Sequence, residues 1–213
     1  MVMIALSVLP GPLAAGVITD SPGDSTFSRR LQAALATLER ADAPIRRLHT
    51  AVMAAPATIT IRPITDDRAT WHPDGDRNRG HTDPDDGRPK SDGRTTPTNA
   101  IIYVPPDVVE TRSTHWKDGL LVHELVHALD LAYGRYDRSD RVRERRAVFF
   151  QNVWRAGLRY KLRTAYHGRF ATLDYQEAVR LGTLADLERY IFTRSDFPPP
   201  PSGSRANPSA KDD

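Results

Sequence analysis

The strongest constraint on the fold of this chain is an apolar segment at residues 120–130 that carries two histidines, Leu-Leu-Val-His-Glu-Leu-Val-His-Ala-Leu-Asp. Its residue types favour a helix. His123 and His127 are four residues apart, so one helical turn places both imidazoles on the same face, within reach of one metal ion. The apolar residues of the opposite face are expected to anchor this helix in the core. They are Leu121, Val122, Leu125, Val126 and Leu129.

Glu124 completes a His-Glu-x-x-His pattern, which is typical of zinc peptidases. It lies about 100° around the helix from the first histidine, too far for a natural third ligand. It can instead reach the open position of the metal and take a proton from a water there. The chain has no cysteine, which excludes a disulfide scaffold, a thiolate zinc site and cysteine nucleophiles. We therefore expect Zn²⁺ as the cofactor and Glu124 as the catalytic base.

A catalytic zinc site has three protein ligands and one water, so one more ligand is needed. Glu144 is favoured, because it is the only glutamate between residues 125 and 176 and lies near the start of the next predicted helix. A turn through Gly134 would fold that helix back beside the first and give the His-His-Glu ligand set of gluzincin-like enzymes. Asp137 and Asp140 in the connecting loop are the rival ligands.

Two further residues are weaker candidates for the third ligand, Asp130 and His115. The metzincin pattern would place a glycine and a third histidine at positions 130 and 133. This chain has Asp130 and Tyr133 there. The metzincin class is therefore excluded.

The rest of the chain predicts an α+β fold that is mostly helical. Apolar spacing indicates helices at 27–38 and 44–52, and alternating β-branched residues indicate a strand at 58–61. A second strand is predicted at 100–104, and we expect it to pair antiparallel with the first. The polar stretch 65–99 between them is expected to form a long surface loop or hairpin tip, because it has little apolar area to bury.

Helices are predicted to dominate after the second strand, at about 114–131, from 139 or 140 to 158, and at 174–192. The expected fold is a zincin-like domain in which a small antiparallel sheet or hairpin precedes the His-Glu-x-x-His helix. We expect one domain over residues 17–195, with 65–99 as a polar insert.

The two ends of the chain are expected to lie outside this domain. Residues 1–16 form a predicted leader, and a disordered segment is favoured over a cleaved signal because no basic residue precedes its apolar stretch. Residues 196–213 form a predicted disordered, Pro-rich tail. No apolar run approaches the roughly 20 residues of a transmembrane helix. The net charge of +3 is spread over interspersed Arg and Asp residues, so we expect no specific nucleic-acid partner, and we expect a monomer.

Residues 17–170 resemble the NleD-like effector metallopeptidases, zinc enzymes that bacterial type III secretion injects into host cells. The matching features are Ile102-Tyr103-x-Pro105, the Leu-x-His-Glu-Leu-x-His-Ala helix, Glu-x-x-Ala-Val at 144–148, Gln151-Asn152, Gly157 and Arg-Thr-x-Tyr at 163–166. The resemblance implies that His123, His127 and Glu144 bind the metal and that Glu124 is the base. It also implies secretion from the bacterial cytoplasm into a host cell and a host signalling protein as the substrate.

Peptide hydrolysis also needs a donor that stabilises the oxyanion beside the metal. Tyr166 is the favoured catalytic donor, with Tyr160 and His167 as alternatives. Asn152 is expected to support the site by hydrogen bonding, and Asp130 to orient the second motif histidine through its free N–H.

The sequence thus predicts a zinc metalloendopeptidase that hydrolyses peptide bonds in a protein substrate. The alternative is a non-catalytic binding module with a structural or degenerate zinc site, whose Arg-rich surface contacts acidic partners or nucleic acid. A structural zinc site normally closes with four protein ligands, which disfavours this alternative. A housekeeping peptidase that the bacterium secretes for itself would share the chemistry and differ only in location.

Overall fold

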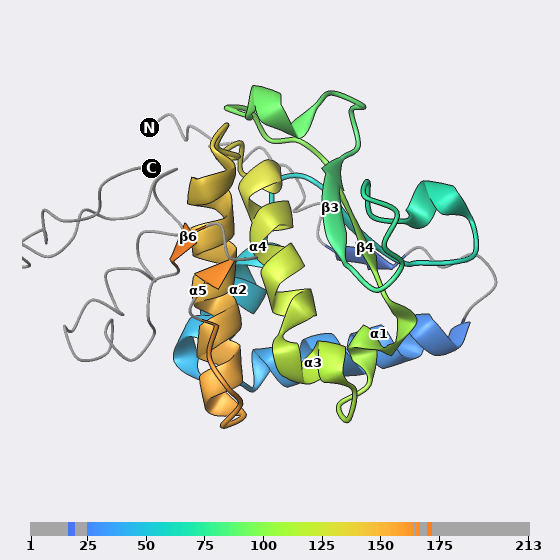
Figure 1. The fold of residues 1–213 in the computed structure, drawn as a ribbon, viewed down its shortest axis with the longest axis vertical. Coiled ribbons are helices and arrows are strands. Elements are labelled where there is room, and N and C mark those ends of the chain that lie inside the picture. The colour runs from blue at the N-terminus through green and yellow to red at the C-terminus, as the bar shows by residue number, and fades with distance from the viewer. Residues whose placement is uncertain (1–16, 20–24, 164, 167–169, 172–213) are drawn as a thin grey trace, which may run out of the picture.

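A computed structural model describes residues 17–19, 25–163, 165–166 and 170–171, and these residues form an α+β fold (Figure 1). The helices are α1 (Ser25–Glu39), α2 (Ala43–Met53), α3 (Thr114–Asp118), α4 (Leu120–Ala132) and α5 (Asp140–Gly157). The strands are β1 (Val17–Thr19), β2 (Ile59–Pro63), β3 (His81–Pro84), β4 (Ala100–Val104), β5 (Ala165–Tyr166) and β6 (Phe170–Ala171). Single 3-10 turns cover Arg68–Thr70, Lys90–Asp92 and Pro106–Val109.

The main sheet has four strands in the order β1-β2-β4-β3. β2 pairs with β4 in parallel, with Ile59 opposite Ala100 and Ile61 opposite Ile102, so the predicted antiparallel pairing is wrong. The alternation of apolar residues fixes which side chains face the core, but it does not fix strand direction. A parallel pair needs a connection of a dozen or more residues, and residues 64–99 supply one. β5 and β6 form a separate antiparallel pair.

The polar insert at 65–99 is more ordered than its composition predicts. It contains β3, which pairs antiparallel with β4 and contacts α4. His81 and Thr82 of this strand are buried, and the His81 ring stacks on Tyr103 at 4.8 Å between ring centroids. Backbone pairing and ring stacking thus order a segment that has few apolar side chains, and the prediction of a surface loop is wrong at β3.

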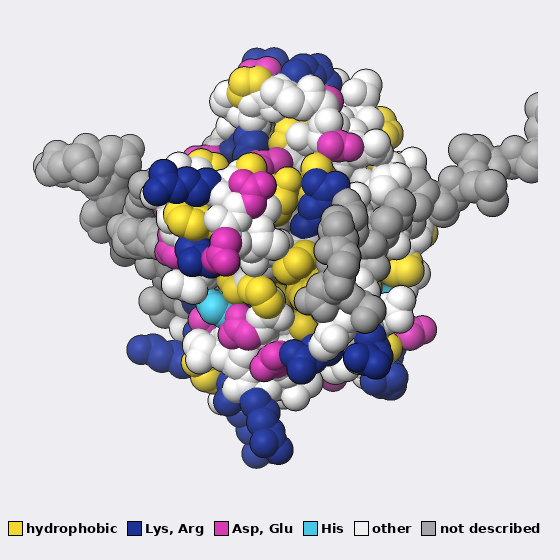
Figure 2. Space-filling model, turned by 90° about the vertical axis from the view of Figure 1, so that its right-hand side faces the viewer, with side chains coloured by type: hydrophobic (Ala, Val, Ile, Leu, Met, Phe, Trp, Pro, Cys, Tyr) yellow, Lys and Arg dark blue, Asp and Glu magenta, His cyan; other side chains and the backbone are white. Residues whose placement is uncertain are grey.

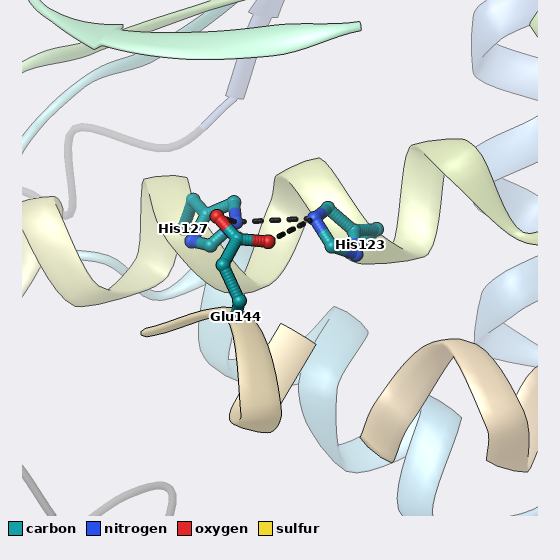
Figure 3. Close-up of side chains that lie close together, drawn as sticks. All are labelled: His123, His127 and Glu144. Atoms are coloured by element: carbon teal, nitrogen blue, oxygen red, sulfur yellow. Dashed lines mark hydrogen bonds and ion pairs between the residues drawn. The ribbon is translucent and has the colours of Figure 1, made fainter. Parts of the chain in front are cut away.

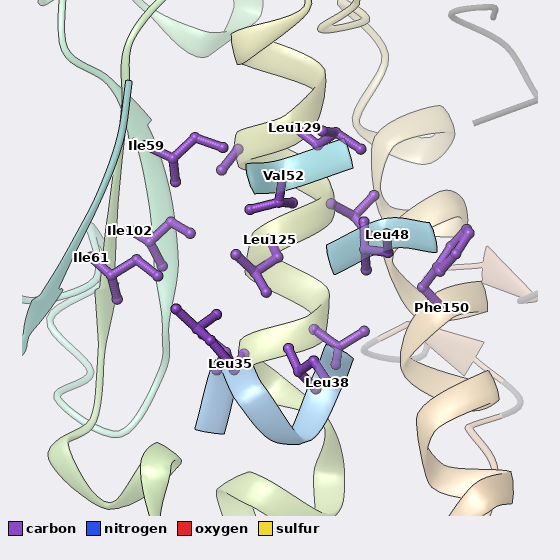
Figure 4. Close-up of a cluster of buried hydrophobic side chains, with 14 of the residues drawn as sticks. Leu35, Leu38, Leu48, Val52, Ile59, Ile61, Ile102, Leu125, Leu129 and Phe150 are labelled. Carbon is purple, nitrogen blue, oxygen red and sulfur yellow. The ribbon is translucent and has the colours of Figure 1, made fainter. Parts of the chain in front are cut away.

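Helix α4 lies between the sheet on one side and α5 on the other (Figure 1). Its predicted anchor residues are all buried, as expected. They pack with side chains of α1, α2, α5 and the strands in one continuous core (Figure 4). Members of this core include Leu35, Leu38, Leu48, Val52, Ile59, Ile61, Ile102, Leu125, Leu129 and Phe150. The metal-ligand candidates therefore project from a helix that is fixed on several sides.

The helix predicted over residues 114–131 is divided at Gly119. This residue has a left-handed conformation, with φ of +74°, and separates α3 from α4. A Cβ atom at this position would lie 2.9 Å from Cδ1 of Trp154. The Trp154 indole also donates a hydrogen bond of 2.9 Å to the carbonyl of Trp116 in α3. Close packing against α5 thus requires glycine here, and the change of direction starts α4 at Leu120.

Three predicted segments lie outside the described residues: the leader 1–16, the helix at 174–192 and the tail 196–213. Among the helices that the structure does describe, none has the length and apolar character needed to span a bilayer. The face drawn in Figure 2 carries basic and acidic side chains in alternation and shows no continuous basic stripe.

Candidate metal centre

Three metal-binding side chains converge at the interface of α4 and α5. His123 and His127 project from α4, and Glu144 projects from the beginning of α5 (Figure 3). The two Nε2 atoms are 3.2 Å apart, and the Glu144 carboxylate oxygens lie 3.2 Å and 3.4 Å from them. Both imidazoles are buried and Glu144 largely so. This group could hold a metal ion, and it is the only such cluster in the described part of the chain.

The turn between α4 and α5 brings Glu144 to the histidines. Gly134 follows the end of α4 with φ of +64°, and a Cβ atom there would lie 2.5 Å from the backbone carbon of Thr96. Two residues later, the Tyr136 carbonyl accepts a 2.7 Å hydrogen bond from the backbone N–H of Arg94. The polar insert therefore holds the connection that positions the start of α5.

Glu144 and His123 favour each other's charged forms. Burial disfavours the charged form of Glu144, but His127 and His123 outweigh it and lower the pKa of this carboxyl far below its usual range. Burial likewise opposes protonation of His123, but the carboxylates of Glu144 and Glu124 outweigh it and raise the pKa of this imidazole. Glu144 is thus a carboxylate at any ordinary pH, which is the form that binds metal.

Neither loop aspartate joins the three donors. The Asp137 carboxylate accepts a 2.7 Å hydrogen bond from the backbone N–H of Ser139, and its carbonyl accepts one of 2.6 Å from Arg143. Asp140 is exposed and forms an ion pair with the same arginine. Both aspartates therefore shape the start of α5, and Glu144 is the carboxylate that the fold brings to the histidines.

The two weaker ligand candidates also have other partners. Asp130 is fully buried and lies 2.5 Å from the guanidinium of Arg146. Burial raises the pKa of Asp130 despite that neighbour. Its predicted hydrogen bond to His127 is absent, since Nδ1 of that ring has no hydrogen-bond partner among the described residues. His115 contacts Asp107, with 2.7 Å between Nδ1 and the carboxylate oxygen.

Glu124 is not one of the three clustered donors and lines the adjacent pocket together with His123, as its position on the helix predicts. Its side chain is buried, and the Thr82 hydroxyl of β3 donates a 2.8 Å hydrogen bond to its Oε2 atom. Gly80 of the insert packs against it, since a Cβ atom there would lie 3.2 Å from Cγ of Glu124. Thr82 and Gly80 were not predicted from the sequence, because nothing in a polar insert indicates that it folds over the motif helix.

The predicted oxyanion donors fall mostly beyond what the structure describes. The backbone of Tyr166 lies in β5, which contacts α5, but its side chain and all of His167 are outside the described atoms. The ring of Tyr160 lies under the guanidinium of Arg155, at 5.1 Å from its centroid. Asn152 is fully buried, and its amide binds the backbone of Arg163, so it supports the segment after α5.

Tyr136 is a neighbour of the centre that the sequence did not reveal. Its ring is buried and its centroid lies 6.4 Å from that of His127. Burial, together with the charges of Glu144 and Glu124, raises the pKa of its phenol despite a nearby arginine. The phenol therefore remains protonated and keeps its capacity to donate a hydrogen bond.

The arrangement combines three convergent metal donors with one separate carboxylate on a pocket wall. Such a set can bind a divalent ion and handle a proton beside it. Comparisons with protein-family models, curated proteins and solved structures find no match for this chain.

Proposed function

We propose that this protein is a zinc-dependent metalloendopeptidase that hydrolyses peptide bonds in a protein substrate. The observation that carries the proposal is the convergence of two imidazole nitrogens, 3.2 Å apart, on one carboxylate, whose two oxygens lie 3.2 Å from His123 and 3.4 Å from His127. Ligands of a tetrahedral zinc ion at 2.0–2.1 Å are separated by about 3.3–3.4 Å, so the spacing fits zinc. Three protein ligands leave a fourth position for water, which is the arrangement of a catalytic site.

The chemistry of the donors also favours zinc over the common hard cations. Calcium and magnesium prefer oxygen ligands, whereas two of the three donors here are imidazole nitrogens. Two histidines and one glutamate form the ligand set of several zinc peptidases.

His123, His127 and Glu144 would hold the zinc ion, which would supply Lewis-acid activation of a water molecule and of the scissile carbonyl. Glu124 takes the proton from the attacking water at its carboxylate and delivers it to the leaving amine. The hydroxyl of Thr82 holds Oε2 of that carboxylate at 2.8 Å and so fixes its direction. Glu124 is buried in the wall of the pocket beside His123.

The oxyanion that develops in this reaction needs a hydrogen-bond donor. We propose Tyr166 for this role, as the sequence predicts. Tyr136 is the second candidate, and it is supported by its buried, protonated phenol and by the 6.4 Å separation of its ring from His127. Tyr166→Phe and Tyr136→Phe are a matched pair of variants. The true donor is the one whose loss lowers kcat without loss of zinc.

The resemblance to the NleD-like family adds a location and a substrate class to the proposal. It supports an effector that is injected through a type III secretion system and cleaves a host signalling protein. The alternative is a binding module with a structural zinc site, which would need a fourth protein ligand; the cluster in the described part of the chain has three.

The decisive experiment compares cleaved peptide bonds in host-cell lysate after addition of wild-type protein or the Glu124→Gln variant. We expect new N-termini only with the wild type, while both proteins keep one zinc per chain. Glu110→Gln, a change at an exposed glutamate that pairs with Arg30, is the matched control and should cleave like the wild type. Zinc in every protein with no cleavage by any would support the binding module.

A further inference from the structure

A small pocket of about 220 Å³ adjoins the candidate metal centre. His123 and Glu124 form one wall, and residues of the insert, α3, α5 and the segment after α5 form the others. Pockets for drug-sized ligands have volumes of about 300–1,000 Å³, so this pocket fits a single amino-acid side chain better than a larger ligand. Its position next to the proposed base makes it a pocket for a residue that flanks the cleaved bond.

Arg163 reaches this pocket from the segment that follows α5 and is held there by two neighbouring residues of α5. The amide of Asn152, which is fully buried, donates a 2.9 Å hydrogen bond to the carbonyl of Arg163 and accepts one of 2.8 Å from its N–H. The guanidinium of Arg163 donates a 3.0 Å hydrogen bond to Gln151 Oε1. The fold thus fixes both the backbone and the side chain of this arginine.

The same network extends to α3. The Gln151 amide nitrogen donates a 2.7 Å hydrogen bond to the carbonyl of Asp118, so this glutamine links Arg163 to the opposite wall of the pocket. Gln151 lies seven residues after Glu144, or about two helical turns, and so projects from the same face of α5. Arg163 and His123 line the same pocket, which places this arginine beside the proposed centre.

Two guanidinium groups line the pocket and suit a negatively charged occupant. Arg79 forms an ion pair with Asp74, and Arg163 donates to the neutral amide of Gln151. The carboxylate of Asp118 is shared with Arg155 at 3.5 Å, and the other carboxylate on the walls is the proposed base, Glu124. A guanidinium binds a carboxylate through two parallel hydrogen bonds, which gives both affinity and orientation.

We propose that Arg163 is a specificity-determining residue that binds a substrate carboxylate in this pocket, so that the enzyme cuts next to an acidic group. The inference rests on the proposed peptidase function and names its substrate class. The carboxylate has two possible sources, the side chain of an Asp or Glu and the C-terminus of the substrate chain. Both have the same chemistry, and suitable peptides separate them.

The test uses two sets of synthetic peptides with randomised sequences, analysed by mass spectrometry after digestion. One set is amidated at the C-terminus and contains Asp and Glu, and the other has a free C-terminus and no acidic side chains. For wild-type protein we expect Glu to be preferred over the isosteric Gln at one position by about 10- to 100-fold in kcat/KM, the contribution of a charged hydrogen bond. If only the second set is cleaved, and near its free C-terminus, the bound carboxylate is the C-terminal one.

Substitution of Arg163 tests the assignment directly. Arg163→Gln should reduce the Glu-to-Gln ratio to about one, and Arg163→Glu should shift the preference to Lys or Arg. The fold should survive, because Asn152 binds only the backbone of this residue, and circular dichroism checks this. Arg88→Gln, in an exposed arginine of the insert, is the matched control and should keep the acidic preference.

The outcomes separate the two proposals. No cleavage of any peptide by wild-type protein would refute the peptidase function and the inference with it. Cleavage without an acidic preference, or an equal loss on acidic and neutral peptides in Arg163→Gln, would overturn the inference alone. An equal loss on both kinds of peptide would mean that Arg163 binds a backbone carbonyl of the substrate. Binding of acidic peptides to Glu124→Gln, weakened about 10-fold or more by adding Arg163→Gln, would support it without turnover.

Discussion

Replacement of Gly134 by alanine tests how the turn between α4 and α5 is held. Alanine in the left-handed conformation is disfavoured by about 1–2 kcal/mol. At Gly134 the new Cβ would also lie 2.5 and 2.7 Å from backbone atoms of Thr96 and 2.8 Å from one of Thr95. Backbone cannot rotate away as a side chain can, so overpacking adds about 1–3 kcal/mol. We therefore expect Gly134→Ala to lower the free energy of unfolding by about 2–5 kcal/mol in total.

Gly87→Ala is the matched control, because Gly87 has φ of +70° and no atom within 4 Å of its would-be Cβ. It should show only the conformational part, about 1–2 kcal/mol. Urea unfolding in the presence of a chelator, followed by the fluorescence of the packed Trp116–Trp154 pair, measures both variants without a contribution from metal. Equal losses in the two variants would refute the claim that the insert fixes this turn. Weakened zinc binding in Gly134→Ala alone would link the turn to the position of Glu144.

Three further predictions follow from particular contacts. Leu125→Ala, at a fully buried position, should lower the free energy of unfolding by about 2–5 kcal/mol in chelator, and a smaller loss would mean that the core repacks around it. Thr82→Val removes the hydrogen bond to Glu124 and should lower kcat about 10-fold or more with unchanged zinc content, while Thr82→Ser should retain activity. Asp83→Asn should destabilise the protein at pH 7 but not at pH 2. Burial would raise the pKa of Asp83, but His81 and Lys90 outweigh burial and lower this pKa to about 2. The charge of Asp83 therefore stabilises the fold above about pH 4, and this stabilisation is lost as the pH falls to 2. An unfolding difference between Asp83→Asn and wild type that persists at pH 2 would contradict this reasoning.

Local patterns predicted α1, α2 and α5 and the positions of β2 and β4 well. The apolar spacing from Phe27 to Leu38 falls within α1, and the spacing around Pro44 to Val52 falls within α2, where the proline lies in the first turn. These patterns succeed because a helix buries one face whatever it packs against. The pair of histidines was predictable for the same reason, since their spacing alone places them on one side of α4.

Contacts between distant parts of the chain were not predictable. The direction of β4 relative to β2 depends on the path of the whole insert, which no local alternation of residues encodes. Thr82 and Gly80 reach Glu124 only because β3 joins the sheet beside α4. Tyr136 and Arg163 were overlooked because aromatic and basic residues are common in this chain, and only their packed positions distinguish them.

The insert emerges as part of the proposed site. It supplies a hydrogen bond to the proposed base, packs on the turn before α5 and contributes Arg79 and Gly80 to the pocket.

Metal stoichiometry at equilibrium tests the central claim most directly. Protein stripped with chelator is dialysed against zinc at low micromolar concentration, and bound metal is counted by elemental mass spectrometry. One zinc per chain is predicted for wild type and for Glu124→Gln, and a large loss for His123→Ala, His127→Ala and Glu144→Ala. A wild-type protein that binds no zinc, or a Glu124→Gln variant that loses it, would contradict the assignment of three ligands and a separate base.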